Sequence, residues 1–156
     1  MSYQLLKSLH LLGVILFLGN IIVTAVWKTL ADRSRRPPLI AYAQRLVTVT
    51  DLAFTAPGAV LILISGHLMA GGHAAVFQTP WLTLGWSLFI VSGLLWALVL
   101  IPVQYRQAKL TRQYASEPEL PAQYWRLARV WMLVGSLVTL LPLANLYVMV
   151  FKPGLN

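Results

Sequence analysis

The stretch LLKSLHLLGVILFLGNIIVTAV, residues 5–26, is long and apolar enough to cross a lipid bilayer as one helix. Crossing the hydrocarbon core takes about 20 apolar residues. Three further segments meet this requirement, and the four predicted spans cover residues 5–28, 52–72, 81–104 and 128–151. We therefore expect an all-α, polytopic membrane protein, a four-transmembrane-helix bundle in which residues 1–156 form a single integral membrane domain.

The composition supports a membrane location. Of the 156 residues, 58% are hydrophobic and only 10% are charged, which is more apolar surface than a soluble domain of this size can bury. The first apolar run is too long for the core of a signal peptide, so we expect it to be retained as a span. Cysteine is absent, which excludes disulfides, thiolate metal sites and iron–sulfur clusters.

The basic residues predict the orientation. Lys and Arg number 12 against 4 Asp and Glu, and ten of the 12 fall on one side of the predicted spans, leaving only Lys7 and Lys152 on the other. Basic loops stay in the cytoplasm. We therefore predict a multi-pass membrane protein with both termini on the side opposite the cytoplasm, in contact with membrane lipid and not with nucleic acid. The Pro37-Pro38 pair could open a short interfacial helix over residues 39–49.

Polar and small residues recur at steps of three and four along three of the spans, which places them on single helix faces. We expect these faces to point into the bundle, where small residues permit close approach and polar ones bond across the interface. The stripes are His10, Gly13, Phe17, Asn20, Thr24 and Trp27; Asp51, Thr55, Gly58, Ile62 and Ser65; and Trp131, Gly135, Val138, Pro142, Asn145 and Met149.

The histidines are the strongest candidates for ligands. His10 and Asn145 are expected about 7 to 10 Å inside the outer boundary, with His67 slightly shallower. Neutral imidazole binds haem iron, copper and zinc, so His10 and His67 are the candidate metal ligands. The competing interpretation of His10 is a hydrogen bond to a carbonyl or to Asn145 across the bundle. His67 lies about 180° from the Asp51 stripe, so it faces another interface or a neighbouring protomer.

A second polar group is expected at the opposite side of the membrane, where Lys28, Asp51, Arg45 and Arg106 lie near helix ends at comparable depth. It predicts either an interfacial ion pair around Asp51 or a site that holds an anion, such as a porphyrin propionate or a lipid phosphate. The complete set of candidate cofactor-binding residues is His10, His67, Asn20, Asn145, Lys28 and Arg106.

Three sequence segments carry a resemblance to known proteins: LLKSLHLLGVILFLGN with its Lys7-x-x-His10 spacing, AVWKTLADR, and TDLAFTAPGAVLILISG. Together they resemble a group of uncharacterised bacterial four-helix integral membrane proteins, which implies a location in the bacterial inner (plasma) membrane with both termini periplasmic. That group looks like a distant relative of HemJ-type protoporphyrinogen oxidases and CopD-type copper-resistance membrane proteins. The HemJ resemblance implies haem b as cofactor, with His10 at the position of the essential first-helix histidine.

Three functions are therefore open. The first is a b-type haem protein, HemJ-like if it is an enzyme, that transfers electrons or oxidises a porphyrin or another lipid-soluble substrate; its partners would include a porphyrin or quinone. The second is a membrane carrier of copper, another metal or a small solute. The third is a non-catalytic assembly subunit. Small four-helix membrane proteins also often associate, so a homo-oligomer is expected. An absorption spectrum of the purified protein distinguishes the first function from the other two.

Overall fold

The computed structural model describes residues 2–153, apart from the side chains of residues 73–75, and this part of the chain consists of helices and short connections without any strand. Four of its helices are long and apolar enough to cross a membrane: Tyr3–Arg33, Pro37–Ala70, Pro80–Gln113 and Ala122–Phe151. The expected all-α membrane bundle is confirmed. Many large apolar side chains on its outer surface are exposed, as contact with lipid requires.

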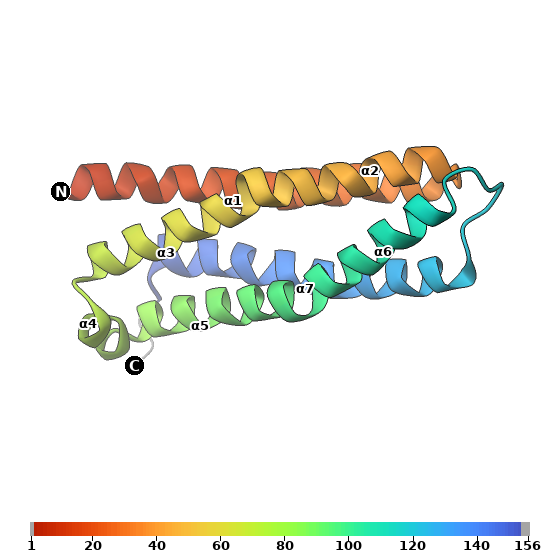
Figure 1. Cartoon of the computed structure of the whole chain (residues 1–156). Coiled ribbons are helices and arrows are strands. Elements are labelled where there is room, and N and C mark those ends of the chain that lie inside the picture. The colour runs from red at the N-terminus through yellow and green to blue at the C-terminus, as the bar shows by residue number, and fades with distance from the viewer. Residues whose placement is uncertain (1, 154–156) are drawn as a thin grey trace.

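Successive long helices run in opposite directions (Figure 1). The first is α1 (Tyr3–Arg33) and the last is α7 (Ala122–Phe151). The second combines α2 (Pro37–Thr50), η1 (Asp51–Thr55) and α3 (Ala56–Ala70), and the third combines α5 (Pro80–Leu95), η2 (Trp96–Leu100) and α6 (Ile101–Gln113). Short α4 (His73–Gln78) joins α3 to α5. We call the end that carries the connections 34–36 and 114–121 the basic end, and the end where α1 begins the terminal end.

The short interfacial helix expected after the first span is instead the first part of the second long helix. Pro37 begins α2 after an extended Arg36, as a proline at the first helical position favours. The apolar face of α2, with Ile40, Ala43 and Val47, is buried, and α2 packs on α1 and α6 rather than lying on the membrane surface. At 1.5 Å per residue the 34-residue helix Pro37–Ala70 is about 50 Å long, so it extends beyond a hydrocarbon core of about 30 Å.

Both central helices contain one π-helical turn, and a proline accounts for each. Pro57 and Pro102 lack an N–H and their rings clash with the carbonyl four residues earlier, which disturbs the regular helical ladder. The N–H of Ala56 then bonds to the carbonyl of Asp51, and the N–H of Ile101 bonds to that of Trp96, five residues back in each case. Such π turns are frequent at functional sites.

The two halves of the bundle differ in their interiors. Towards the basic end, α2 packs on α6, and the residues buried there include Gln44, Gln107 and Thr111. Towards the terminal end, α3 packs on α1 and α5 packs on α7, around an apolar cluster that contains Phe17 and Phe89. The polar interior of the basic half ends at the two π turns, which therefore mark the boundary between the halves.

The inward stripes predicted for the first two spans face each other in the α1–α3 interface. Gly13 and Gly58 lie at its closest point: a Cβ atom built on Gly58 would lie 2.8 Å from the backbone nitrogen of Phe17 and 2.9 Å from the carbonyl oxygen of Gly13. Only glycine permits this approach of two backbones. The close contact fixes the register in which His10 meets Ser65 and Asn20 meets Asp51.

Candidate functional site

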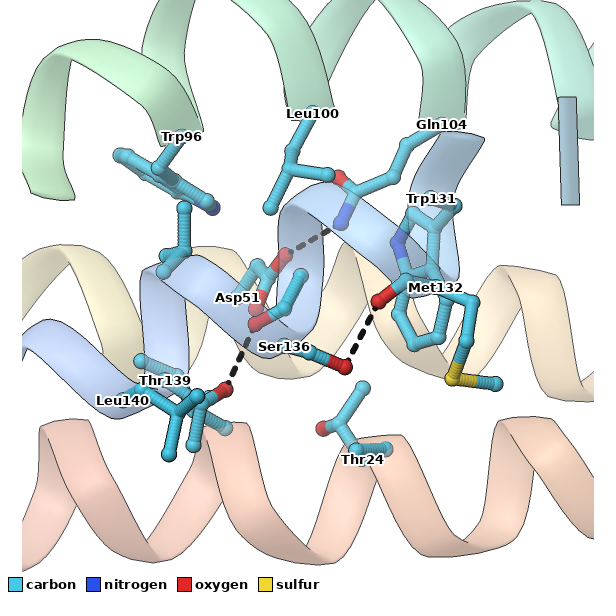
Figure 2. A pocket seen from close by; sticks show the side chains of 14 residues that line it. Thr24, Asp51, Trp96, Leu100, Gln104, Trp131, Met132, Ser136, Thr139 and Leu140 are labelled. Atoms are coloured by element: carbon cyan, nitrogen blue, oxygen red, sulfur yellow. Dashed lines mark hydrogen bonds between the residues drawn. The ribbon is translucent and has the colours of Figure 1, made fainter. Parts of the chain in front are cut away.

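A cavity of about 390 Å³ lies where the four long helices meet beside the π turns (Figure 2). Its polar lining comes from Thr24 of α1, Asp51 of η1, Gln104 of α6, and Ser136 and Thr139 of α7, while Trp96 and Trp131 supply aromatic walls. The rest of the lining is mostly aliphatic. A few convergent polar groups in an apolar cavity of this size are typical of a small-molecule binding site.

Asp51 is the only acidic residue among those that line the cavity, and its carboxylate is held by three donors. The Asn20 amide and the Thr55 hydroxyl donate to Oδ1 at 3.2 and 2.9 Å, and the Gln104 amide donates to Oδ2 at 3.0 Å. Two oxygens offer about four acceptor positions, so three neutral donors occupy most of them and fix the orientation of the carboxylate.

The donors of Asp51 are arranged by the π turn and by the α1–α3 interface. The Thr55 hydroxyl reaches Asp51 from one turn along η1, and it also accepts a hydrogen bond of 2.8 Å from the Asn20 amide. The Asn20 oxygen accepts in turn from Thr24 at 3.4 Å. Each donor therefore has a single useful orientation, which holds the carboxylate rigidly at the wall of the cavity.

The expected ion pair at Asp51 is absent from the described part of the chain, so that prediction is wrong. Arg45 and Arg106 are exposed at the basic end, and Lys28 pairs with Asp32 instead of Asp51. The physical reason is distance along the bundle. Asp32 lies one turn after Lys28 on the same helix face, whereas Asp51 lies deeper in the bundle and is surrounded by uncharged donors. Asp51 thus has no charged partner among the hydrogen bonds described.

Lys28, predicted as a cofactor-binding residue, belongs to a separate cluster with Asp32 and Tyr124. Its ammonium lies 2.7 and 2.6 Å from the two Asp32 oxygens and 2.7 Å from the Tyr124 hydroxyl, which itself donates to Asp32 at 2.5 Å. Lys28 and Tyr124 are 0% exposed. The ammonium also lies 5.6 Å from the centre of the Trp131 ring, so this cluster supports one wall of the cavity.

His10 lies between α1 and α3, with Nδ1 3.1 Å from the Ser65 hydroxyl and the ring against Gly66. The geometry corresponds to the interhelical hydrogen bond that was one of the two interpretations, with Ser65 as the side-chain partner in place of Asn145. The ring is part-buried in the interface and is not turned towards lipid. Whether it binds haem stays a prediction, and neither of the two cavities described is lined by His10.

His67 and Asn145 were expected in the same layer of the bundle as His10, but the contacts described for them are with α5. His67 meets the Trp86 ring edge-on at 6.1 Å, in the direction of α5 rather than α1. Asn145 lies against Gly85 in the α5–α7 interface, with its buried Oδ1 lacking a described partner. In the part of the chain that the structure describes, no three His, Asp or Glu side chains lie close enough together to hold a metal ion.

Sequence reasoning missed three residues of these two clusters. Gln104 is the last residue of the third predicted span, next to a basic segment that was interpreted as a connection, and nothing in the sequence around it indicates that it is a partner of Asp51. Asp32 and Tyr124 were also missed. The spacing of Lys28 and Asp32, four residues apart on a helix, was a signal that could have identified their pair.

The cavity opens towards the lipid-facing surface of α7. Leu140, at its rim, is 61% exposed, and Met132 and Ser136 are exposed on the same side. Asp51 lies about 20 Å along the helix from Pro37 and about 30 Å from Ala70. With a hydrocarbon core of about 30 Å extending from the terminal end, the carboxylate lies near the edge of the core that faces the basic end. A ligand can therefore enter sideways from the membrane.

Comparison with known proteins places the chain in a family. No curated protein and no solved structure matches it, and the resemblance to HemJ-type and CopD-type proteins stays a prediction. The family model described as "Predicted integral membrane protein (DUF2269)" matches residues 4–153, nearly the whole chain. This match, together with the four membrane-length helices, shows that the chain belongs to the DUF2269 family of integral membrane proteins.

Proposed function

We propose that the protein binds a small lipid-soluble organic cation in the Asp51 cavity, as a membrane carrier of small solutes does. One observation carries the proposal: a carboxylate held only by neutral donors forms part of the wall of a cavity that opens towards lipid. The sequence leaves three functions open, and this proposal corresponds to the second of them, a membrane carrier, with a small solute as the ligand.

The charge of Asp51 selects a cation. An ionised carboxylate near hydrocarbon is costly unless an opposite charge or a set of hydrogen bonds compensates it. The donors Asn20, Thr55 and Gln104 favour the ionised form, but they leave its net negative charge without a counter-ion. A cationic ligand in the cavity supplies that charge. Because most acceptor positions of the carboxylate are already occupied, an ammonium that interacts mainly through its charge fits better than a strong hydrogen-bond donor.

The aromatic walls select the same class of ligand. Trp96 and Trp131 present indole rings to the cavity, and the face of an indole ring attracts ammonium groups, quaternary ammonium in particular. The volume of about 390 Å³ lies in the range of small-molecule pockets. The lateral opening requires that the ligand dissolve in the membrane, with its charge near the headgroups on the side of the basic end. The excess of basic residues there predicts that this side is cytoplasmic.

A matched pair of probes tests the proposal: benzyltrimethylammonium, and its neutral isostere neopentylbenzene. Binding is measured by isothermal titration to the purified protein in lipid nanodiscs. We expect Asp51→Asn, which keeps the shape and removes the charge, to weaken benzyltrimethylammonium binding by at least about tenfold. Neopentylbenzene binding is expected to change by less than about twofold, because its contacts are apolar.

Glu117→Gln is the control variant. Glu117 is an exposed carboxylate in the connection 114–121, so its neutralisation is expected to leave the binding of both probes unchanged. The proposal is contradicted if the ammonium does not bind to the native protein, or if Asp51→Asn leaves its affinity unchanged. It is also contradicted if Asp51→Asn weakens the two probes equally, because the loss would then be structural and not due to charge.

Haem binding is the separate prediction for His10. An oxidised and then dithionite-reduced absorption spectrum of the same preparation measures it. A Soret band that is lost in His10→Ala would support the haem hypothesis, and a colourless protein would contradict it. The outcome is independent of the cation test, because the Asp51 cavity is not lined by His10.

A further inference from the structure

Trp131 carries a buried hydrogen-bond donor at the cavity that has no acceptor. The residue is 6% exposed, and its Nε1 is buried without a partner among the described residues. A buried N–H without an acceptor is unfavourable and uncommon in native proteins. Trp131 lines the cavity, and Figure 2 shows its indole nitrogen on the side that faces Asp51 and Gln104.

The ring of Trp131 is held firmly in this orientation. It belongs to an apolar cluster with Leu100, Val103 and Val138. The Lys28 ammonium lies 5.6 Å from the ring centre, and Lys28 is itself fixed by Asp32 and Tyr124. The apolar cluster and the Lys28 ammonium both restrain the indole, so turning its N–H towards another acceptor would disrupt the packing.

We propose that the Trp131 indole N–H donates a hydrogen bond to an oxygen of the bound ligand, whose cationic group faces Asp51. This proposal rests on the proposed function and narrows its ligand class to lipid-soluble amines that carry a carbonyl or a similar acceptor. Asp51 then recognises the charge and Trp131 recognises the acceptor. Two fixed polar groups in an otherwise apolar cavity give a ligand a defined orientation.

Another unpartnered indole provides the control. The Nε1 of Trp27 is also buried without a described partner, but Trp27 does not line the cavity. A tryptophan-to-phenylalanine change removes the N–H and keeps an aromatic ring at either position. Only the change at Trp131 is expected to alter how the site distinguishes ligands.

The test uses phenacyltrimethylammonium, which has a ketone, and 2-phenylethyltrimethylammonium, in which a methylene replaces the carbonyl. We expect the native protein in nanodiscs to bind the ketone about fivefold more tightly than the methylene probe, as one hydrogen bond to a buried donor permits. In Trp131→Phe the ratio of the two dissociation constants is expected to fall to about one. In Trp27→Phe the native ratio is expected to persist.

The methylene probe also reports whether Trp131→Phe has folded, because its binding needs the cavity and Asp51 but not the N–H. If this variant fails to fold, the indole N–H signal of Trp131 is followed by NMR in the native protein. A downfield shift with the ketone and none with the methylene probe supports the proposal, and equal responses overturn it. A native preference that is absent, or that survives in Trp131→Phe, also overturns it.

The two proposals fail in different ways. If Asp51→Asn weakens both ammonium probes while the ketone preference does not depend on Trp131, the cation site stands and only the role of Trp131 is lost. If neither ammonium binds, or if Asp51→Asn has no effect on either, the proposed function itself fails and the role of Trp131 fails with it.

Discussion

Replacement of Gly58 by alanine is expected to destabilise the bundle by about 1–3 kcal/mol, because the new methyl group overpacks the α1–α3 interface. Its Cβ would lie 2.8 Å from the Phe17 nitrogen and 2.9 Å from the Gly13 carbonyl oxygen. Both are backbone atoms, so the helices themselves must separate. The measurement is thermal unfolding of the purified protein in detergent, followed by tryptophan fluorescence.

Gly19→Ala is the matched control, because a Cβ at Gly19 meets nothing within 4 Å. In a helix, alanine is favoured over glycine by about 0.8–1 kcal/mol, so Gly19→Ala is expected to leave the melting temperature unchanged or to raise it. The two variants thus move in opposite directions. Equal effects would show that glycine matters here through helix propensity and not through close packing. Separation of α1 from α3 would also weaken the Asn20 hydrogen bond to Asp51, so Gly58→Ala is expected to reduce cation binding as well.

Replacement of Lys28 by methionine is expected to destabilise the protein by about 3 kcal/mol, at the lower end of the effect of breaking a buried ion pair. Lys28 is 0% exposed, and its loss leaves Asp32 and the Tyr124 hydroxyl without their cation. Asp32 keeps some contact with solvent, which limits the penalty, since its side chain is 15% exposed. Thermal unfolding in the same detergent measures the change.

Two companion variants separate charge from packing. Lys109→Met removes an exposed lysine of α6 and is expected to change the stability by less than about 0.5 kcal/mol. The double variant Lys28→Met with Asp32→Asn removes both charges, so it is expected to recover part of the loss. A double variant no more stable than Lys28→Met alone would contradict an electrostatic origin and would indicate lost packing around Trp131.

Periodicity alone predicted much of the fold. The steps of three and four that place Gly13 and Asn20 on one face, and Gly58 and Asp51 on another, correspond to the contacts between α1 and α3. The reasoning works because a helix face is fixed by local geometry and needs no knowledge of its partner. The lengths of the helices were less predictable. Residues 39–49 were expected to form a separate interfacial helix and the residues after 104 a connection, whereas α2 and α6 continue the two central helices and pack together, with Gln44 and Gln107 inside.

The partners of Asp51 could not be predicted for a different reason. Its hydrogen bonds come from residues 31 and 53 positions away, Asn20 and Gln104, and from the π turn that carries Thr55. The second π turn, Trp96–Leu100, precedes Gln104 and alters its angular position, so a regular helix extrapolated past that turn does not place Gln104 towards Asp51. The ion pairs that were expected between Asp51 and Arg45 or Arg106 do not form, because opposite charge does not determine whether two side chains can reach each other.

The amino-acid sequence by itself determined that this chain is a four-span membrane protein of alternating direction, because apolar length and the distribution of basic residues act through the bilayer rather than through specific contacts. Only the tertiary structure decided which polar residues meet. In that structure His10 bonds to Ser65, Lys28 pairs with Asp32 and bonds to Tyr124, and Asp51 is surrounded by neutral donors at a cavity. These pairings depend on helix register, backbone approach and π turns, which are properties of packed helices and not of any one segment.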